Sequence, residues 1–251
     1  MQTRNLEEES RISELGNDFA DLAVVIPVYN EEKNIKSCIE SWTRELTDLE
    51  IRYILIILND GSGDETERVL SELPQEKSIQ IIHKRNEGHG PTILRGYTRA
   101  VEIAEWVFQV DSDNELPAEV FHTFWNARHQ KEAVLGFRIG REQSFVRRFI
   151  SRTAKYATRL LYNSHIKDVN IPYRLIRSNI LAPIVSHIPH DTFAPNIAIS
   201  GALAKTGAAV SELPVPFAPR THGIASLNDL SAFTNAMKSL VQLARISRSF
   251  T

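Results

Sequence analysis

Cysteine is almost absent from this chain. Cys38 is the only one in 251 residues, which excludes an internal disulfide and a metal site built from several cysteines. A single cysteine also fits a reducing compartment, so we expect a cytoplasmic protein. Cys38 falls in one series with Ile35, Ile39 and Trp42, a spacing that predicts the apolar face of a helix. We therefore interpret Cys38 as a core residue.

Long hydrophobic runs are also missing. The longest stretch that looks buried is YILIIL, residues 53–58, whereas a membrane-spanning helix needs about 20 apolar residues. The N-terminus, MQTRNLEEESRISELGNDFADL, is polar and acidic where a signal peptide has its apolar core. These absences predict a protein that is soluble or lies peripherally on the inner face of a membrane.

Neither sign of charge dominates. The formal net charge is −2, and 42% hydrophobic with 24% charged residues is an ordinary globular composition. This balance gives no argument for nucleic acid, and we expect no nucleic-acid partner. The chain also lacks a P-loop pattern and a G-x-G-x-x-G after its first predicted strand. Any bound nucleotide must be held by other groups.

What the chain does contain is an alternation of strands and helices. Apolar runs of strand length occupy 22–28, 51–58, 78–83, 106–110 and 132–137, and helical stretches begin after Asn30, at 61–73, at Pro91 and at Pro117. The runs do not alternate polar with apolar, which is typical of strands covered on both faces. The pattern predicts an α/β fold with a mostly parallel sheet flanked by helices and a C-terminal helical extension.

Polar residues and glycines gather where these strands end, which is where open α/β sheets bind ligands. In chain order they are Tyr29, Asn30 and Glu31; residues 59–64; residues 86–90; and Asp111, Ser112 and Asp113. Each group alone also fits a helix cap or a turn. Four such groups at one edge favour a binding site.

The last group is the most specific. Asp111 and Asp113 flank one residue after the strand WVFQV, so on an extended segment their carboxylates point the same way. Such neighbours repel unless a cation lies between them, and oxygen ligands suit Mg²⁺ or Mn²⁺. Glu115 offers another oxygen. The alternative is a polar loop in which Asp113 caps the helix beginning at Pro117.

Several segments resemble a known family in their order and spacing. VVIPVYNEEKNI, LNDGSGDET, NEGHGPTILRGYTRA and VFQVDSDNELP look like glycosyltransferase family 2. LGFRIGR, KDVNIPYRLIRSNIL and VPVPFAPRTHGIASL are similar to its polyprenyl-phosphate or dolichol-phosphate sugar transferase branch. The resemblance covers about 21–228 and implies a GT-A fold. It also implies a metal-dependent, inverting hexosyltransferase with a nucleotide-diphosphate sugar donor.

The resemblance also implies a domain organisation. Residues 1–20 would be an N-terminal extension and 21–226 the glycosyltransferase domain, with a nucleotide half at about 21–115 and an acceptor half at about 116–226. Residues 227–251 carry apolar side chains at three- and four-residue spacing, which predicts an amphipathic helix. This helix could dock on its own domain, on a membrane or on a second copy.

Roles for individual residues follow from the same resemblance. Nucleotide-binding residues would be Pro27, Tyr29, Asn30, Glu31, Asp60, Gly88, His89, Gly90, Arg95, Asp111 and Ser112. Asp111, Asp113 and Glu115 would hold the metal, and Asp113, Asp168 and Arg220 would be catalytic. Many relatives have two aspartates where this chain has Asn59 and Asp60, so the motif does not indicate the nucleotide base.

A cationic stretch follows the fifth predicted strand. Residues 138–167 contain eight arginines and lysines and one acid, Glu142, with interleaved aromatic and aliphatic residues. This predicts a basic amphipathic helix that meets a phosphate or an anionic membrane, or one that packs on the domain with its basic face in solvent. By resemblance, Arg138 and Arg147 or Arg148 bind the phosphate of a lipid-phosphate acceptor, and Arg220 the donor diphosphate.

Two acceptor chemistries stay open. A polyprenyl phosphate is already anionic, whereas a hydroxyl of a glycan or small molecule needs a base, for which Asp168 is the candidate. Asp168 could instead be a structural residue that fixes Arg174 or a backbone turn. Two other classes also remain, a nucleotidyltransferase and a catalytically silent nucleotide-binding module.

Overall fold

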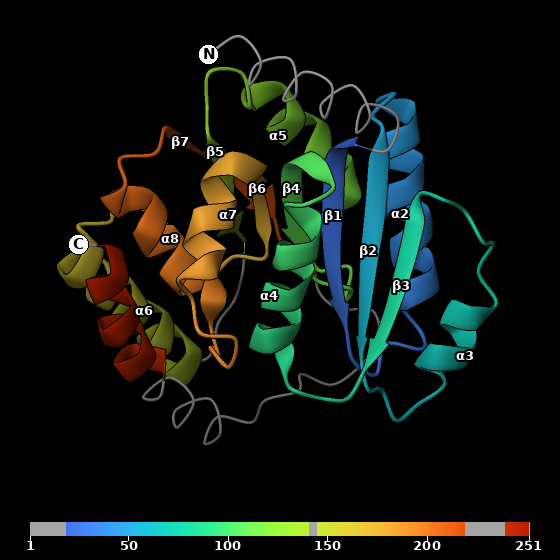
Figure 1. Ribbon diagram of the computed structural model, residues 1–251, viewed down its shortest axis with the longest axis horizontal. Helices are drawn as coiled ribbons and strands as arrows, with labels where there is room; N and C mark the ends of the chain where they lie inside the picture. The colour runs from blue at the N-terminus through green and yellow to red at the C-terminus, as the bar shows by residue number, and fades with distance from the viewer. Residues whose placement is uncertain (1–18, 141–144, 219–238, 251) are drawn as a thin grey trace, which may run out of the picture.

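A computed structural model describes residues 19–140, 145–218 and 239–250, and for residues 145–151 it describes the backbone alone. The predicted α/β architecture is confirmed: helices cover both faces of one sheet (Figure 1). In the described parts of the chain, no helix has the length and apolar composition that crossing a bilayer requires.

The sheet has seven strands in the order β3-β2-β1-β4-β6-β5-β7. Their bounds are β1 Ala20–Val28, β2 Tyr53–Asp60, β3 Ile79–Lys84, β4 Ala104–Val110, β5 Ala133–Ile139, β6 Tyr173–Arg177 and β7 Val210–Pro216. Only β6 runs against its neighbours in this described sheet, and the other pairs are parallel. The prediction of a mostly parallel sheet is therefore correct.

The strands β6 and β7 are absent from the sequence prediction for separate reasons. β6 is five residues long and has the fully buried Arg174 as its second residue, so its apolar pattern is interrupted. β7 contains Pro214 and Pro216, which read as turn residues. Because β7 lies at the edge of the sheet, its missing N–H groups are tolerated there.

Helices fill the intervals between strands. They are α2 Ile35–Asp48, α3 Thr66–Ser71, α4 His89–Ala100, η1 Ala118–Val120, α5 Phe121–Ala127, α6 Phe145–Tyr162, α7 Ser178–Ser186, α8 Pro195–Lys205 and η2 Ser247–Phe250. The helix expected to begin at Pro91 begins two residues earlier, at His89, and ends at Ala100.

The core has two halves, one on each face of the sheet. Buried residues of α4, α6, α7 and α8 share one cluster with the sheet, and those of α2, α3 and α5 share the other. In the second cluster Trp42 packs on Phe108 with a centroid distance of 5.2 Å, and Phe108 on Tyr173 at 4.7 Å. Cys38 is fully buried in that cluster, which confirms its interpretation as a core residue.

The C-terminal part that the structure describes lies against α6 and α8. Residues 239–246 are helical, and Leu243 and Ile246 are buried. Tyr162 of α6 donates its hydroxyl to the Leu243 carbonyl at 3.1 Å, and Lys205 of α8 donates to the Ser247 carbonyl at 3.0 Å. This part is therefore docked on its own domain, while residues 227–238 of the predicted helix and residues 1–18 lie outside the described chain.

Candidate active site

The strand order brings the four predicted strand ends together. β3, β2, β1 and β4 are consecutive and parallel in the sheet, so their carboxyl ends meet at one edge, toward the bottom of Figure 1. The loops at 29–34, 61–65, 85–88 and 111–117 follow these ends. The expectation that they share one edge is confirmed.

Hydrogen bonds tie the first two loops to each other. The Asn30 amide oxygen accepts from the Gly63 N–H at 2.8 Å, and the Asn30 N–H donates to Ser62 Oγ at 3.0 Å. Asn30 has a φ of 56°, a left-handed conformation that asparagine adopts more readily than most residues. The Glu31 N–H donates to Thr66 Oγ1 at 2.9 Å. Tyr29 beside them is 44% exposed, so the loop pair presents an aromatic ring at this edge.

Asp60 organises the third loop. Its carboxylate is buried and accepts from the Glu87 N–H and the Gly88 N–H, both at 2.9 Å. It also pairs with Lys84 at the end of β3. The neighbouring Asn59 accepts from the Ser62 N–H at 3.1 Å. The role of Asp60 in binding the nucleotide stays a prediction. In the structure its direct partners are residues 86–90, which we call the glycine loop, and Lys84, which the sequence prediction did not name.

The glycine loop depends on close backbone contact. A Cβ added to Gly90 would lie 2.1 Å from the Thr192 carbonyl oxygen and 2.4 Å from that of Phe193. Gly88 has a φ of 96°, which side chains rarely allow. His89 between them places Nε2 3.5 Å from Asp111 Oδ1. The loop thus lies beside the paired carboxylates, whereas Arg95 is exposed further along α4.

The paired carboxylates have unequal environments. Asp113 is buried and accepts from the Glu115 N–H at 3.1 Å, whereas the Asp111 side chain is 27% exposed. Burial raises the pKa of Asp111 to about 6; the negative charges of Asp113 and Glu115 act in the same direction, and His89 and Arg138 oppose them. A cation next to Asp111 would favour its charged form. The next helical turn, η1, begins at Ala118 with Pro117 as its N-cap and without a side-chain cap, so the capping interpretation of Asp113 is not supported.

The carboxylates at this site fit a hard divalent cation that completes its coordination with phosphate oxygens and water. Among the described residues, no three His, Cys, Asp or Glu side chains are grouped closely enough to hold a metal alone. Mg²⁺ sites commonly use only one or two carboxylates and take their remaining ligands from substrate phosphates and water. Asp111 and Asp113 offer two such carboxylates at the site edge.

Arg138 and Asp168 form a two-pronged ion pair. Arg138 Nε lies 2.8 Å from Asp168 Oδ2, and Arg138 Nη2 lies 3.0 Å from Oδ1. Burial alone would raise the pKa of Asp168, but the hydrogen bonds and charge of Arg138 outweigh it and lower that pKa. The structural alternative is half correct: the arginine partner of Asp168 is Arg138 and not Arg174, but Asp168 also accepts from the backbone of Asn170, as a residue that fixes a turn does. A carboxylate with a lowered pKa is also a weaker base.

Other predicted site residues lie outside what can be described. The side chains of Arg147 and Arg148 and all of Arg220 are beyond the described side chains, so their predicted phosphate contacts stay predictions. Pro27 and Ser112 do lie in the described part, at the end of β1 and between the two aspartates.

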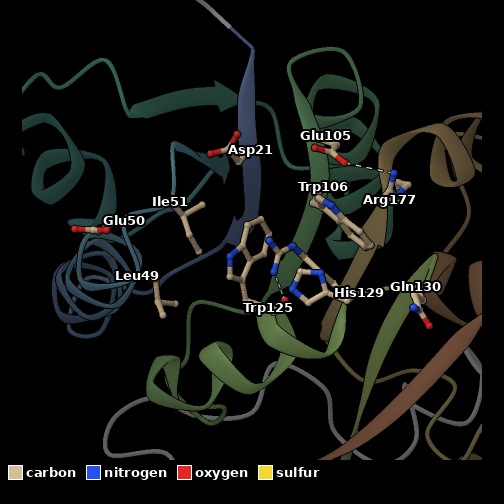
Figure 2. Close-up of a pocket in the computed structure, with 11 residues that line it drawn as sticks. Asp21, Leu49, Glu50, Ile51, Glu105, Trp106, Trp125, His129, Gln130 and Arg177 are labelled. Carbon is tan, nitrogen blue, oxygen red and sulfur yellow. Dashed lines mark hydrogen bonds and ion pairs between the residues drawn. The ribbon is translucent and has the colours of Figure 1, made fainter.

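A separate cavity of about 410 Å³ opens at the opposite edge of the sheet (Figure 2). Its lining includes Asp21, Glu105 and Trp106 near the starts of β1 and β4. Arg177, at the end of the antiparallel β6, is 3.4 Å from Glu105 and stacks on Trp106. Since these residues mark the amino ends of the parallel strands, this cavity is distinct from the carboxylate site.

Comparison with solved structures places this fold. Glucosyl-3-phosphoglycerate synthase from Mycobacterium tuberculosis, crystallised with phosphoglyceric acid, superposes with a TM-score of 0.66 over 94% of this chain and 84% of that chain at 19% identity. The same enzyme with Mn²⁺, uridine diphosphate and phosphoglyceric acid also gives 0.66, over 94% and 82% at 19% identity. At this identity the likeness establishes the fold.

Two curated relatives are similar in sequence. Both are undecaprenyl-phosphate 4-deoxy-4-formamido-L-arabinose transferases. The protein of Pectobacterium carotovorum is 27% identical over 72% of this chain and 56% of its own length. That of Edwardsiella ictaluri is 27% identical over 88% of this chain and 66% of its own length. The chain therefore spans between half and two thirds of the length of these relatives.

A family model for glycosyl transferase family 2 matches residues 23–193. The match covers well over half of the chain and includes the ends of β1, β2, β3 and β4, Asp111, Asp113 and the Arg138–Asp168 pair. The carboxylate edge and the glycine loop are thus parts of the matched domain, and the chain belongs to glycosyl transferase family 2.

Proposed function

We propose that this chain is an inverting glycosyltransferase that moves a sugar from a nucleotide-diphosphate sugar to a polyprenyl phosphate. The observation that carries the proposal is the pair Asp111 and Asp113 beside the glycine loop, at the carboxyl ends of four neighbouring parallel strands. Family membership and the names of the curated relatives support the reaction and the acceptor class.

The proposed donor site uses the residues of this edge. The nucleotide would lie against Tyr29, the hydrogen-bonded loops at 29–34 and 61–65, and the glycine loop. Asp111 and Asp113 would hold Mg²⁺ or Mn²⁺, with Glu115 nearby. When bound, such a cation supplies Lewis-acid stabilisation of the departing diphosphate. We propose that Arg220 adds positive charge at the same diphosphate, because a guanidinium pairs two phosphate oxygens at once.

The proposed acceptor site centres on Arg138. Its Nε and Nη2 already bind Asp168, so an arriving phosphate would compete with or bridge this pair and would need further cations. Arg147 and Arg148 are our candidates. An anionic phosphate needs no strong base, which agrees with the lowered pKa of Asp168.

Transfer to a hydroxyl is the second candidate. The structural neighbour was crystallised with Mn²⁺, UDP-glucose and phosphoglyceric acid, which makes a small phosphorylated acceptor a fair competitor. Asp168 would then have to leave Arg138 to accept the hydroxyl proton.

A thermal-shift panel tests the donor class. We expect one of UDP, GDP, CDP and dTDP to raise the melting temperature more with Mn²⁺ than without it, because a ligand that binds the native state stabilises it. No Mn²⁺-dependent shift for any of the four would contradict the proposal. With the sugar nucleotide so identified, undecaprenyl phosphate, phosphoglyceric acid and simple saccharides then separate the acceptors. Release of pyrophosphate would indicate a nucleotidyltransferase, and absence of turnover a silent module.

We also propose that α6 contacts the membrane carrying the acceptor. Tyr156 and Leu160 are 74% and 85% exposed and lie on one face with Arg152, Lys155 and Arg159, all exposed. Such a face suits an anionic lipid surface.

Vesicle co-sedimentation tests this face. We expect binding to phosphatidylglycerol vesicles, weak binding to phosphatidylcholine vesicles, and about tenfold weaker binding by the double variant Tyr156→Ser, Leu160→Ser. Equal binding of the parent and the double variant to the anionic vesicles would contradict a docking role for α6.

A further inference from the structure

A chain of buried polar side chains runs from α4 through α8 and β4 to Asp111. The Tyr97 hydroxyl donates to Asn196 Oδ1 at 3.1 Å, Asn196 Nδ2 donates to Gln109 Oε1 at 2.9 Å, and Gln109 Nε2 donates to Asp111 Oδ1 at 3.0 Å. Tyr97 and Gln109 are completely buried, and Asn196 is 3% exposed.

Core packing does not require polar side chains at these buried positions. Gln109 lies in β4 between buried residues, where an apolar side chain would avoid the cost of taking an amide out of water. Its two hydrogen bonds offset that cost, and one of them ends on a carboxylate of the proposed metal site. We therefore explain the buried amide of Gln109 by its hydrogen bond to Asp111.

The order of donors fixes how each amide is turned. The ionised Asp111 carboxylate can only accept, so the NH₂ group of Gln109 faces it. The Gln109 oxygen then accepts from the NH₂ group of Asn196, and the Asn196 oxygen accepts from the Tyr97 hydroxyl. Asn196 is itself anchored, because its backbone carbonyl accepts from Arg174 Nη1 at 3.0 Å.

Within the described chain, the polar contacts of Asp111 fall on a single oxygen. Gln109 Nε2 donates to Oδ1, and His89 Nε2 lies 3.5 Å from the same atom. This arrangement fixes the carboxylate rotamer from one side and leaves Oδ2 for a ligand on the other.

We infer that Gln109, Asn196 and Tyr97 are positioning residues that orient Asp111 for a divalent cation. The inference rests on the proposed function and adds Tyr97 of α4 and Asn196 of α8 to the residues of the site. Groups that orient a metal ligand typically change metal affinity by about 10- to 100-fold when removed.

The inference is tested by the affinity for Mn²⁺ at a saturating concentration of the nucleotide that the thermal-shift panel identifies, with free Mn²⁺ measured by electron paramagnetic resonance. We expect Gln109→Met to raise the Kd for Mn²⁺ by at least about tenfold. Tyr97→Phe removes one oxygen that is three hydrogen bonds away from Asp111 and should raise the Kd about threefold. The control Tyr162→Phe loses a similar buried hydroxyl bond, to the Leu243 carbonyl, and should leave the Kd unchanged.

A double-mutant cycle separates orientation from general loosening. If the three side chains act as one chain, Tyr97→Phe has little further effect in the Gln109→Met background. Parent-like Kd values in both single variants, or independent effects that multiply, would overturn the inference while leaving the proposed function intact. A parent that takes up no Mn²⁺ with UDP, GDP, CDP or dTDP would overturn both.

Discussion

Asp113→Asn is expected to abolish sugar transfer while the fold persists. The substitution keeps the size of the side chain and an oxygen that can accept from the Glu115 N–H, as Asp113 does at 3.1 Å. It removes one of two charges that would hold the cation facing the leaving diphosphate. We expect turnover to fall by about 10³-fold, which corresponds to about 4 kcal/mol of transition-state stabilisation.

The measurement is the rate of nucleoside diphosphate release at saturating Mn²⁺, alongside a melting curve. Asp48→Asn is the matched control, since this exposed aspartate ends α2 away from the site, and it should retain full activity. A well-folded Asp113→Asn variant with turnover near that of the parent would contradict the assignment of Asp111 and Asp113 as the cation ligands.

Arg174→Met is expected to cost about 3–5 kcal/mol of unfolding free energy. Arg174 is completely buried and donates to the backbone carbonyls of Ile171 at 3.0 Å, Asn196 at 3.0 Å and Val169 at 3.2 Å. Methionine fills a similar volume but removes all three donated bonds. The Val169 carbonyl keeps the Ser200 hydroxyl as a donor at 2.8 Å, whereas the carbonyls of Ile171 and Asn196 lose the Arg174 donor, and each buried group left unsatisfied costs about 1–3 kcal/mol.

Whether the loss of Arg174 is neutral or destabilising depends on the kind of group to which it donates. Replacing a whole buried ion pair by apolar residues is often neutral, because both polar groups leave together. In the described chain Arg174 has no carboxylate within ion-pair distance, and its backbone partners cannot be removed by mutation. Arg174→Met therefore lowers the free energy of unfolding with no compensating gain.

Urea unfolding monitored by circular dichroism gives the free energy of the parent and the variant. Arg159→Met on the exposed face of α6 is the control, and its effect should stay within about 0.5 kcal/mol. A loss below 1 kcal/mol for Arg174→Met would contradict the account of Arg174 as the donor to three carbonyls.

The first five strands could be predicted because each contains an apolar run of strand length. β6 and β7 could not, since Arg174 interrupts one pattern and two prolines the other. Arg174 is acceptable in a strand only because carbonyls from the chain before β6 and from α8 surround it, a condition that no local sequence window contains.

The site divides in the same way. The spacing of Asp111 and Asp113 is local, so the sequence predicted the pair and its chemistry. Asp60–Lys84, Arg138–Asp168 and Gln109–Asn196 join residues that are 24, 30 and 87 positions apart. Sequence reasoning named Arg138 and Asp168 separately, for two different roles, and did not pair them.

The sequence by itself determined the kind of sheet, the edge at which polar groups collect and the carboxylate pair, because strand periodicity and short spacings act within a few residues. Only the tertiary structure decided which oxygen of Asp111 is held, that Asp168 is already paired with an arginine, and that Asp60 binds the glycine loop. Those outcomes depend on which distant donor comes within about 3 Å of each acceptor, and chain packing sets that distance.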